Sequence, residues 1–273
     1  VGFANTTQHK HAILRNFPVL GYFRYLFEMI APEIQQYFIE RSTDGKPFSR
    51  NERSLVYQRA KNIDSTTPFG TQLNLNDPHY EGIKHSIFPA TVNEELPRVT
   101  IGGPDCTQPY SASLLNISAM SFGSLSENAI VALNKGAQQG KFYHNTGEGG
   151  LTEFHQQGGD ICWQIGTGYF GCRDDRGGFD GGRFTEKANL PEVKMIEIKL
   201  SQGAKPGHGG VLPAAKNTVQ IAKIRGVLPH TTILSPPSHS AFENTKGLID
   251  FIATLRKLSN GKPIGFKLCI GET

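Results

Sequence analysis

The stretch "MIEIKLSQGAKPGHGG", residues 195–210, joins an alternating apolar and polar segment to a loop rich in glycine. The alternation predicts a strand with one apolar face and one face that carries Glu197 and Lys199. A strand buried on both faces normally reads as a continuous apolar run. The charged face therefore favours a strand that faces the lumen of a barrel holding a polar cofactor. The alternative is an edge strand with a solvated face.

Strands and helices alternate on both sides of this stretch. Predicted strands lie in 114–120, 142–150, 195–200, 231–239 and 264–271. Predicted helices run from a Ser126 cap to Gly140, from Asn217 or Thr218 through 219–226, and over 245–258. This alternation predicts parallel βαβ units, whose functional residues gather where the strands end.

The first part of the chain differs from the rest. Residues 16–40 are rich in aromatic side chains at helical spacing, and Pro32 is expected to divide them into two helices or to start the second. The apolar face predicts either a helical cap on a core or a patch that touches a membrane surface. We expect a helical and irregular extension over 1–95 and the strand-rich domain over 96–273.

Composition narrows the classes of function. The chain has 273 residues, 37% of them hydrophobic, and a net charge of +4 without a stripe of Lys and Arg, so nucleic-acid binding is not expected. Its 4 cysteines form no CxxC pair or metal-like cluster, and reduced thiols are expected. No apolar run is long enough to span a membrane. Because the sequence begins at Val1 and ends just after a predicted strand, we expect segments to be missing at both ends.

Two glycine-rich loops each carry an isolated charge. Glu148 in "NTGEGG" could bind an amine or a cation or act as a general base, and a solvated turn is the alternative. Lys205 in "GAKPGHGG" suits a carboxylate or phosphate, and His208 could share that anion or relay protons, unless the loop is simply exposed. Neither loop fits a P-loop or a Rossmann motif.

Two further candidates come from the end of the chain. Lys267 on the last predicted strand could face an electron-rich ring or an enolate, or could extend to solvent. Ser235 and His239 in "SPPSH" lack the G-x-S-x-G elbow of a hydrolase, so nucleophilic catalysis is not expected there.

The segments "LNISAMSFGSLS", "HNTGEGG", "IKLSQGAKPGHGG", "LSPPSH" and "FKL" occur in the order found in the central FMN-binding domain of glutamate synthases. The N-terminal "HAILRNFPVLGYFRYL" resembles a smaller group, the FMN-binding glutamate synthase family proteins. The resemblance implies an α/β fold, a TIM-like (β/α)8 barrel with FMN at its mouth. Only about four or five strands, the N-terminal half of that barrel, are expected in this chain.

The resemblance also implies roles for individual residues. Glu148 and Lys205 correspond to the 2-oxoglutarate site, and Arg225 to an arginine of the same site. Lys267 is similar to the lysine that approaches the flavin ring, so Glu148, Lys205 and Lys267 are the catalytic candidates. Further flavin candidates are Ala119, Met120, Ser121, Gln164 and Gln202. Val211, His208 and Val227 depart from the family pattern, which has Gln, Glu and Asp there, and this puts 2-oxoglutarate itself in doubt.

The expected function is that of an FMN-dependent oxidoreductase that reduces an imine formed from a 2-oxo acid. The resemblance places the iron–sulfur cysteines and the loops that grip the flavin phosphate beyond this chain. It implies as partners a second chain that completes the barrel, an electron donor such as ferredoxin, and a membrane anchor preceding Val1, with a cytoplasmic or cytoplasmic-side location. The alternative is a catalytically inactive barrel fragment that serves as a binding or assembly module.

Overall fold

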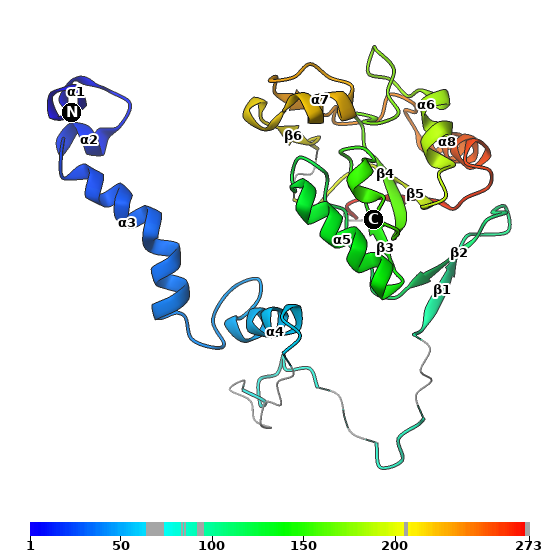
Figure 1. Cartoon of the computed structure of the whole chain (residues 1–273), viewed down its shortest axis with the longest axis horizontal. Coiled ribbons are helices and arrows are strands. Elements are labelled where there is room, and N and C mark those ends of the chain that lie inside the picture. Colours follow the sequence, from blue (N-terminus) through cyan, green and yellow to red (C-terminus); the bar gives the residue numbers. More distant parts are fainter. Residues whose placement is uncertain (64–73, 83, 85, 92–95, 205–206, 271–273) are drawn as a thin grey trace. The chain divides into compact units, whose positions relative to one another are not determined.

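The structure is a computed structural model that describes residues 1–63, 74–82, 84, 86–91, 96–204 and 207–270. The chain divides into two compact units, Val1–Ala90 and Thr91–Thr273 (Figure 1). The predicted βαβ units lie in the second of them.

The described part of the first unit is helical. Its elements are α1 (Gly2–Thr7), α2 (Ala12–Asn16), α3 (Gly21–Ile34), a π-helix (Gln35–Ile39) and α4 (Arg50–Ala60). The expected break at Pro32 is wrong, because α3 continues through it and then widens into the π-helix. Proline removes one backbone donor and crowds one carbonyl, and in the last turn of a helix this affects few intrahelical bonds.

The apolar face of α3 stays open within its own unit. Leu26, Ile34 and Phe38 are exposed there, so the expected helical cap on a core does not form within this unit. No helix in the described ranges is both long and apolar enough to cross a membrane.

A four-stranded parallel sheet is the centre of the second unit. The strands lie side by side in the order β3 (Tyr143–Asn145), β4 (Asp160–Ile165), β5 (Val193–Lys199) and β8 (Ile264–Lys267). Two small antiparallel ribbons accompany the sheet, β1 (Arg98–Ile101) with β2 (Tyr110–Ser113), and β6 (Val211–Leu212) with β7 (Ile233–Leu234). The α/β class and the parallel sheet are thus as expected, while a closed barrel is not seen among the described residues.

Three strand predictions need correction. Strand β4 was not expected, because nearly all of it is buried and its sequence shows no clear alternation. Residues 114–120 form no strand and contribute a single bridge, from Ile117 to His144. The strand expected within 231–239 shortens to β7, which pairs with β6 outside the parallel sheet.

The helices of the second unit begin at side-chain caps. They are α5 (Glu127–Gly140), α6 (Gly181–Ala188), α7 (Val219–Arg225) and α8 (Thr245–Leu258), with short 3-10 turns at Glu153–His155 and Ala214–Lys216. The predicted cap Ser126 accepts a hydrogen bond from the N–H of Ala129, and Thr218 rather than Asn217 caps α7. Helix α6 was not predicted. Helix α7 ends at Gly226, whose φ of +65° suits glycine.

The sheet has one apolar face and one polar face. Strands β4 and β5 direct isoleucines and Trp163 toward α6 and α8, which lie together in Figure 1. Trp163 is fully buried and stacks on Phe184 of α6 at a ring-centroid distance of 5.4 Å. The opposite face carries Glu197 and Lys199, as the alternation in β5 predicted. Helix packing therefore leaves the polar face free to form a site.

Two buried histidines, His144 of β3 and His155 of the following 3-10 turn, predict that the stability of the second unit depends on pH. Burial lowers the pKa of His144 from 6.5 to about 4, and burial together with His144 lowers that of His155 to about 3. The unfolded chain therefore binds more protons below pH 6.5, and the stability that these histidines contribute is present above that pH and lost below it. We expect each histidine to lower the free energy of unfolding by about 2 kcal/mol when the pH falls from 7 to 5.

Urea unfolding monitored by the fluorescence of Trp163 measures this loss in the second unit. His144→Leu removes one titrating group whose ring nitrogens have no partner among the described residues. The variant should lose about half as much stability as the parent between the two pH values. An equal loss of stability in both proteins would show that His144 does not contribute to the pH dependence.

Candidate active site

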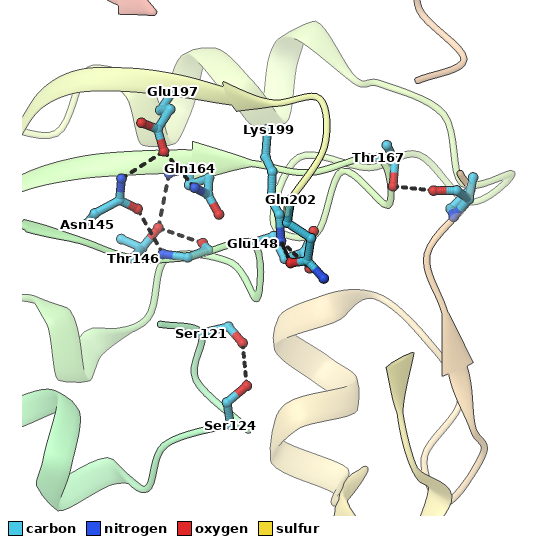
Figure 2. A network of polar contacts seen from close by, with 12 residues as sticks. Ser121, Ser124, Asn145, Thr146, Glu148, Gln164, Thr167, Glu197, Lys199 and Gln202 are labelled. Carbon is cyan, nitrogen blue, oxygen red and sulfur yellow. Dashed lines mark hydrogen bonds and ion pairs between the residues drawn. The ribbon is translucent and has the colours of Figure 1, made fainter. Parts of the chain in front are cut away.

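A row of polar side chains crosses the sheet near the carboxyl ends of its strands. Glu197 Oε1 accepts hydrogen bonds from Asn145 Nδ2 at 3.0 Å and from Gln164 Nε2 at 2.6 Å (Figure 2). The parallel register places Gln164 beside Glu197, and Lys199 beside Lys267 one step further along. One carboxylate therefore ties three adjacent strands together.

The glycine loop after β3 takes its shape from this row. Asn145 Oδ1 accepts the backbone N–H of Gly147 at 3.0 Å, and Thr146 Oγ1 accepts that of Gln164 at 3.1 Å. Gly147 has a φ of +64°, and a Cβ at this position would lie 2.6 Å from the backbone nitrogen of Ser121. Only glycine suits both the conformation and the close approach of the two loops.

Glu148 and Lys199 form an ion pair at the end of β5. Lys199 Nζ lies 3.0 Å from Glu148 Oε1 and 2.8 Å from Gln202 Oε1, and Figure 2 shows the three side chains converging. The two charged side chains are only 12% and 17% exposed. Gly210 and Gly166 flank the carboxylate so closely that a Cβ on either would overlap with Glu148. The bare backbone on both sides thus makes room for this charge.

Arg225 reaches the same place from α7. Its Nη2 donates to the carbonyl of Phe122 at 3.0 Å, and its guanidinium lies 5.1 Å from the centroid of the Phe170 ring. Burial lowers the pKa of Arg225, and the negative charge of Glu148 opposes that shift. Glu148 therefore interacts electrostatically with a second cation besides Lys199.

The "SPPSH" segment is tied to the end of β5 by His239. Its Nε2 lies 2.9 Å from the carbonyl of Lys199, and its Nδ1 lies 3.1 Å from the hydroxyl of Tyr169. Burial lowers the pKa of His239. Because a carbonyl only accepts, the neutral ring donates from Nε2 and accepts the Tyr169 hydroxyl at Nδ1. His239 therefore links the end of β5 to Tyr169.

These elements enclose a cavity of about 270 Å³. Its lining consists of Ala119, Met120, Ser121, Ser124, Gly147, Glu148, Gln164, Lys199, Gln202, Gly210, Val211, Leu212, Arg225 and Ser235. A smaller hollow of about 20 Å³ beside it shares Glu148, Lys199, Gln202 and Gly210 and adds His208. Segments far apart in the sequence therefore meet around Glu148.

Most of the residues predicted from the sequence meet here. Those that line the larger cavity are Glu148, Arg225, Ala119, Met120, Ser121, Gln164 and Gln202. His208 lines the smaller hollow, and Lys267 shares a face with Lys199 without lining either space. Lys205 lies outside the described residues. Their roles in binding and catalysis stay predictions.

Sequence reasoning missed Lys199 and Glu197 as site residues. The alternation in β5 had placed both on the polar face, and that was the available signal. The partner of Glu148 could not be chosen from the sequence, because Lys199, Lys205 and Lys267 all follow predicted strands or lie on them. In the described part of the chain, no group of three His, Cys, Asp or Glu side chains could hold a metal ion.

Comparisons with known proteins place these residues in context. A family model described as "Conserved region in glutamate synthase" matches residues 72–273. The chain is 36% identical to the glutamate synthase large subunit-like protein YerD of Bacillus subtilis, over an alignment that covers 97% of this chain and 58% of that protein. It is 35% identical to the archaeal-type glutamate synthase [NADPH] of Thermotoga maritima, over 55% of this chain and 27% of that protein. The archaeal glutamate synthase [NADPH] of Methanocaldococcus jannaschii is 30% identical over 56% of this chain and 28% of its own length.

The ion pair of Glu148 and Lys199 makes a prediction about stability. Lys199→Met leaves the largely buried carboxylate without its cation, and Glu148→Met removes the other partner. A double-mutant cycle of the two changes should give a coupling free energy of about 0.5–3 kcal/mol. Urea unfolding monitored through Trp163 measures it.

Lys267→Met is the matched control for this cycle. Lys267 lies beside Lys199 in register, and it forms no ion pair with any of the described residues. Its coupling to Glu148→Met should be close to zero, and equal coupling for both lysines would show that Glu148 does not select Lys199.

Proposed function

This chain belongs to the glutamate synthase family, and we propose that it binds flavin and substrate in an FMN-dependent oxidoreductase that reduces an imine formed from a 2-oxo acid. The observation that carries the proposal is the cavity around Glu148, where the carboxyl ends of parallel strands meet two glycine loops and Arg225. Cofactors and substrates of parallel α/β folds bind at this end of the strands. The chain spans 58% of the length of its Bacillus relative, so the activity of a whole protein is part of the proposal.

The residues around the cavity fit a flavin ring. Ala119, Ser121 and Gly147 line the cavity, and their small size leaves room for a planar ring. Gln164 donates a hydrogen bond from its side-chain amide to Glu197, which fixes the orientation of the amide. Its amide oxygen can then accept a hydrogen bond from a ligand. A flavin ring carries one N–H that needs such an acceptor, and carbonyl groups that need donors. We propose that Gln164 and Gln202 hold the ring edges and that Lys267 compensates charge on the reduced ring.

The chemistry divides between the cofactor and the chain. Reduced FMN, when bound, supplies a hydride to the imine carbon and is itself oxidised, while the imine nitrogen takes up a proton. Glu148 has lone pairs beyond the one that Lys199 uses, and can accept a hydrogen bond from the substrate nitrogen and hold a proton there. Lys199 orients the carboxylate through the ion pair, and Arg225 adds a second positive charge near it. Gly210 lets Glu148 occupy its place without steric conflict.

The sheet gives a reason to expect further strands. Strand β8 pairs with β5 along one edge, and no strand among the described residues pairs with its other edge. A (β/α)8 barrel needs eight strands to close. We propose that strands from a second chain or from a longer polypeptide complete the barrel. Ferredoxin as electron donor, iron–sulfur cysteines and a membrane anchor stay predictions that the described residues do not test.

Flavin binding is the first experimental test of the proposal. Titration of FMN with the purified full chain should quench the flavin fluorescence and shift its absorption bands. Gly147→Val places a side chain against the backbone of Ser121 and should weaken this binding. A chain that stays colourless and cannot be reconstituted with FMN would contradict the proposal for this polypeptide, though not for a longer protein that contains it, and would favour the binding-module alternative.

Gly210→Ala tests the role of Glu148. The added Cβ would lie 2.6 Å from Glu148 Oε1, so the flexible side chain must move while the backbone can stay in place. Substrate-driven oxidation of the reduced flavin should fall by about tenfold to a hundredfold, because small displacements of a catalytic group cost that much. Bound flavin should be retained.

Gly203→Ala is the matched control in the same loop. A Cβ there would lie 3.9 Å from Cys269 Sγ, in ordinary contact, and should leave the rate unchanged. Loss of flavin together with activity in Gly210→Ala would mean that Glu148 supports the cofactor rather than the substrate.

A further inference from the structure

The cavity around Glu148 has an excess of one positive charge among its described lining residues. Lys199 and Arg225 are cationic, Glu148 is the single carboxylate, and the other described residues of the lining are uncharged. A ligand that carries one negative charge would balance the charge of these described side chains, whereas a dianion would exceed it.

Both cations have hydrogen-bond donors to spare. Lys199 uses two of its three N–H donors, on Glu148 and Gln202. Arg225 donates from Nη2 to Phe122, and its Nε is buried without a partner among the described residues. A ligand carboxylate in the cavity could accept a hydrogen bond from the remaining donor of Lys199 and could interact with the positive charge of Arg225, which also lines the cavity.

Part of the lining is apolar. Val211 and Leu212 of β6 line the cavity together with Met120. Leu212 is buried in a cluster with Ile221 and Ile233, and β6 is held in register with β7. This wall is therefore part of a packed ribbon, and it offers no charged donor among the described residues. A carboxylate placed against it would gain no cation from the described residues.

We propose that the substrate is a 2-oxo acid with a single carboxylate and an aliphatic side chain, or the corresponding amino acid, rather than a dicarboxylic acid. The carboxylate lies toward Lys199 and Arg225, and the side chain lies against Val211 and Leu212. This inference rests on the proposed function and narrows its substrate class.

Ligand binding to the full chain with oxidised FMN bound measures the preference without relying on turnover. Titrations with 4-methyl-2-oxopentanoate and with 2-oxoglutarate are followed by the flavin absorption shift and by calorimetry. The aliphatic acid should bind at least about tenfold more tightly, since a site that leaves a polar substrate group unpaired discriminates against it. Ammonia-dependent reoxidation of the reduced flavin should show the same order of preference.

A charge placed on the apolar wall should reverse the preference. Val211→Lys adds a cation where the aliphatic side chain is expected, and should favour 2-oxoglutarate by about tenfold relative to the parent. Val219→Lys is the matched control, because Val219 is an exposed valine of α7 outside the cavity lining. It should leave the ratio unchanged.

The outcomes separate this inference from the proposed function. Equal or tighter binding of 2-oxoglutarate by the parent chain overturns the inference and leaves an FMN-dependent 2-oxo acid site intact. Failure to bind FMN, or a flavin spectrum that neither acid perturbs, overturns the proposed function for this polypeptide and this inference with it. If Val211→Lys does not fold, the ratio measured for the parent chain decides.

Discussion

Glu197 sets the geometry on which the cavity depends. Its Oε1 accepts the side-chain amides of Asn145 and Gln164, so three neighbouring strands are held at one level near their carboxyl ends. Asn145 then fixes the glycine loop by accepting the N–H of Gly147. That loop presents Glu148 to Lys199, which stands two residues beyond Glu197 on the same strand face. A slip of one residue in any strand would move each of these groups to the wrong face.

The two faces of the sheet have different energetic roles. Burial of Trp163 and the neighbouring isoleucines against α6 and α8 removes apolar surface from water and supplies the main stabilisation of the second unit. Polar groups on the other face would cost free energy if they lacked partners, and Glu197, Gln164 and Asn145 meet that cost by bonding to one another. The excess positive charge lies beyond this satisfied row, where a ligand can reach it.

Local signals in the sequence predicted much of this arrangement. Capping at Ser126, the helix at 245–258 and the alternation in β5 each depend on neighbouring residues, and the structure confirms them. Strand β4 was missed because burial on both faces removes the alternation that identifies a strand. Residues 114–120 were assigned to a strand because they are apolar, and the structure gives them one bridge through Ile117 instead.

The sequence by itself determined the family, the parallel α/β class and the loops that carry Glu148, because these follow from ordered motifs and from the period of apolar residues. Only the tertiary structure decided that Lys199 pairs with Glu148, whereas the resemblance had already assigned Arg225 and Val211 to the site whose cavity they line. The physical reason is that strand register and helix packing decide which charged side chains lie close together. Both bring together residues that are distant in the chain, and no local sequence pattern indicates which of several lysines will pair with Glu148.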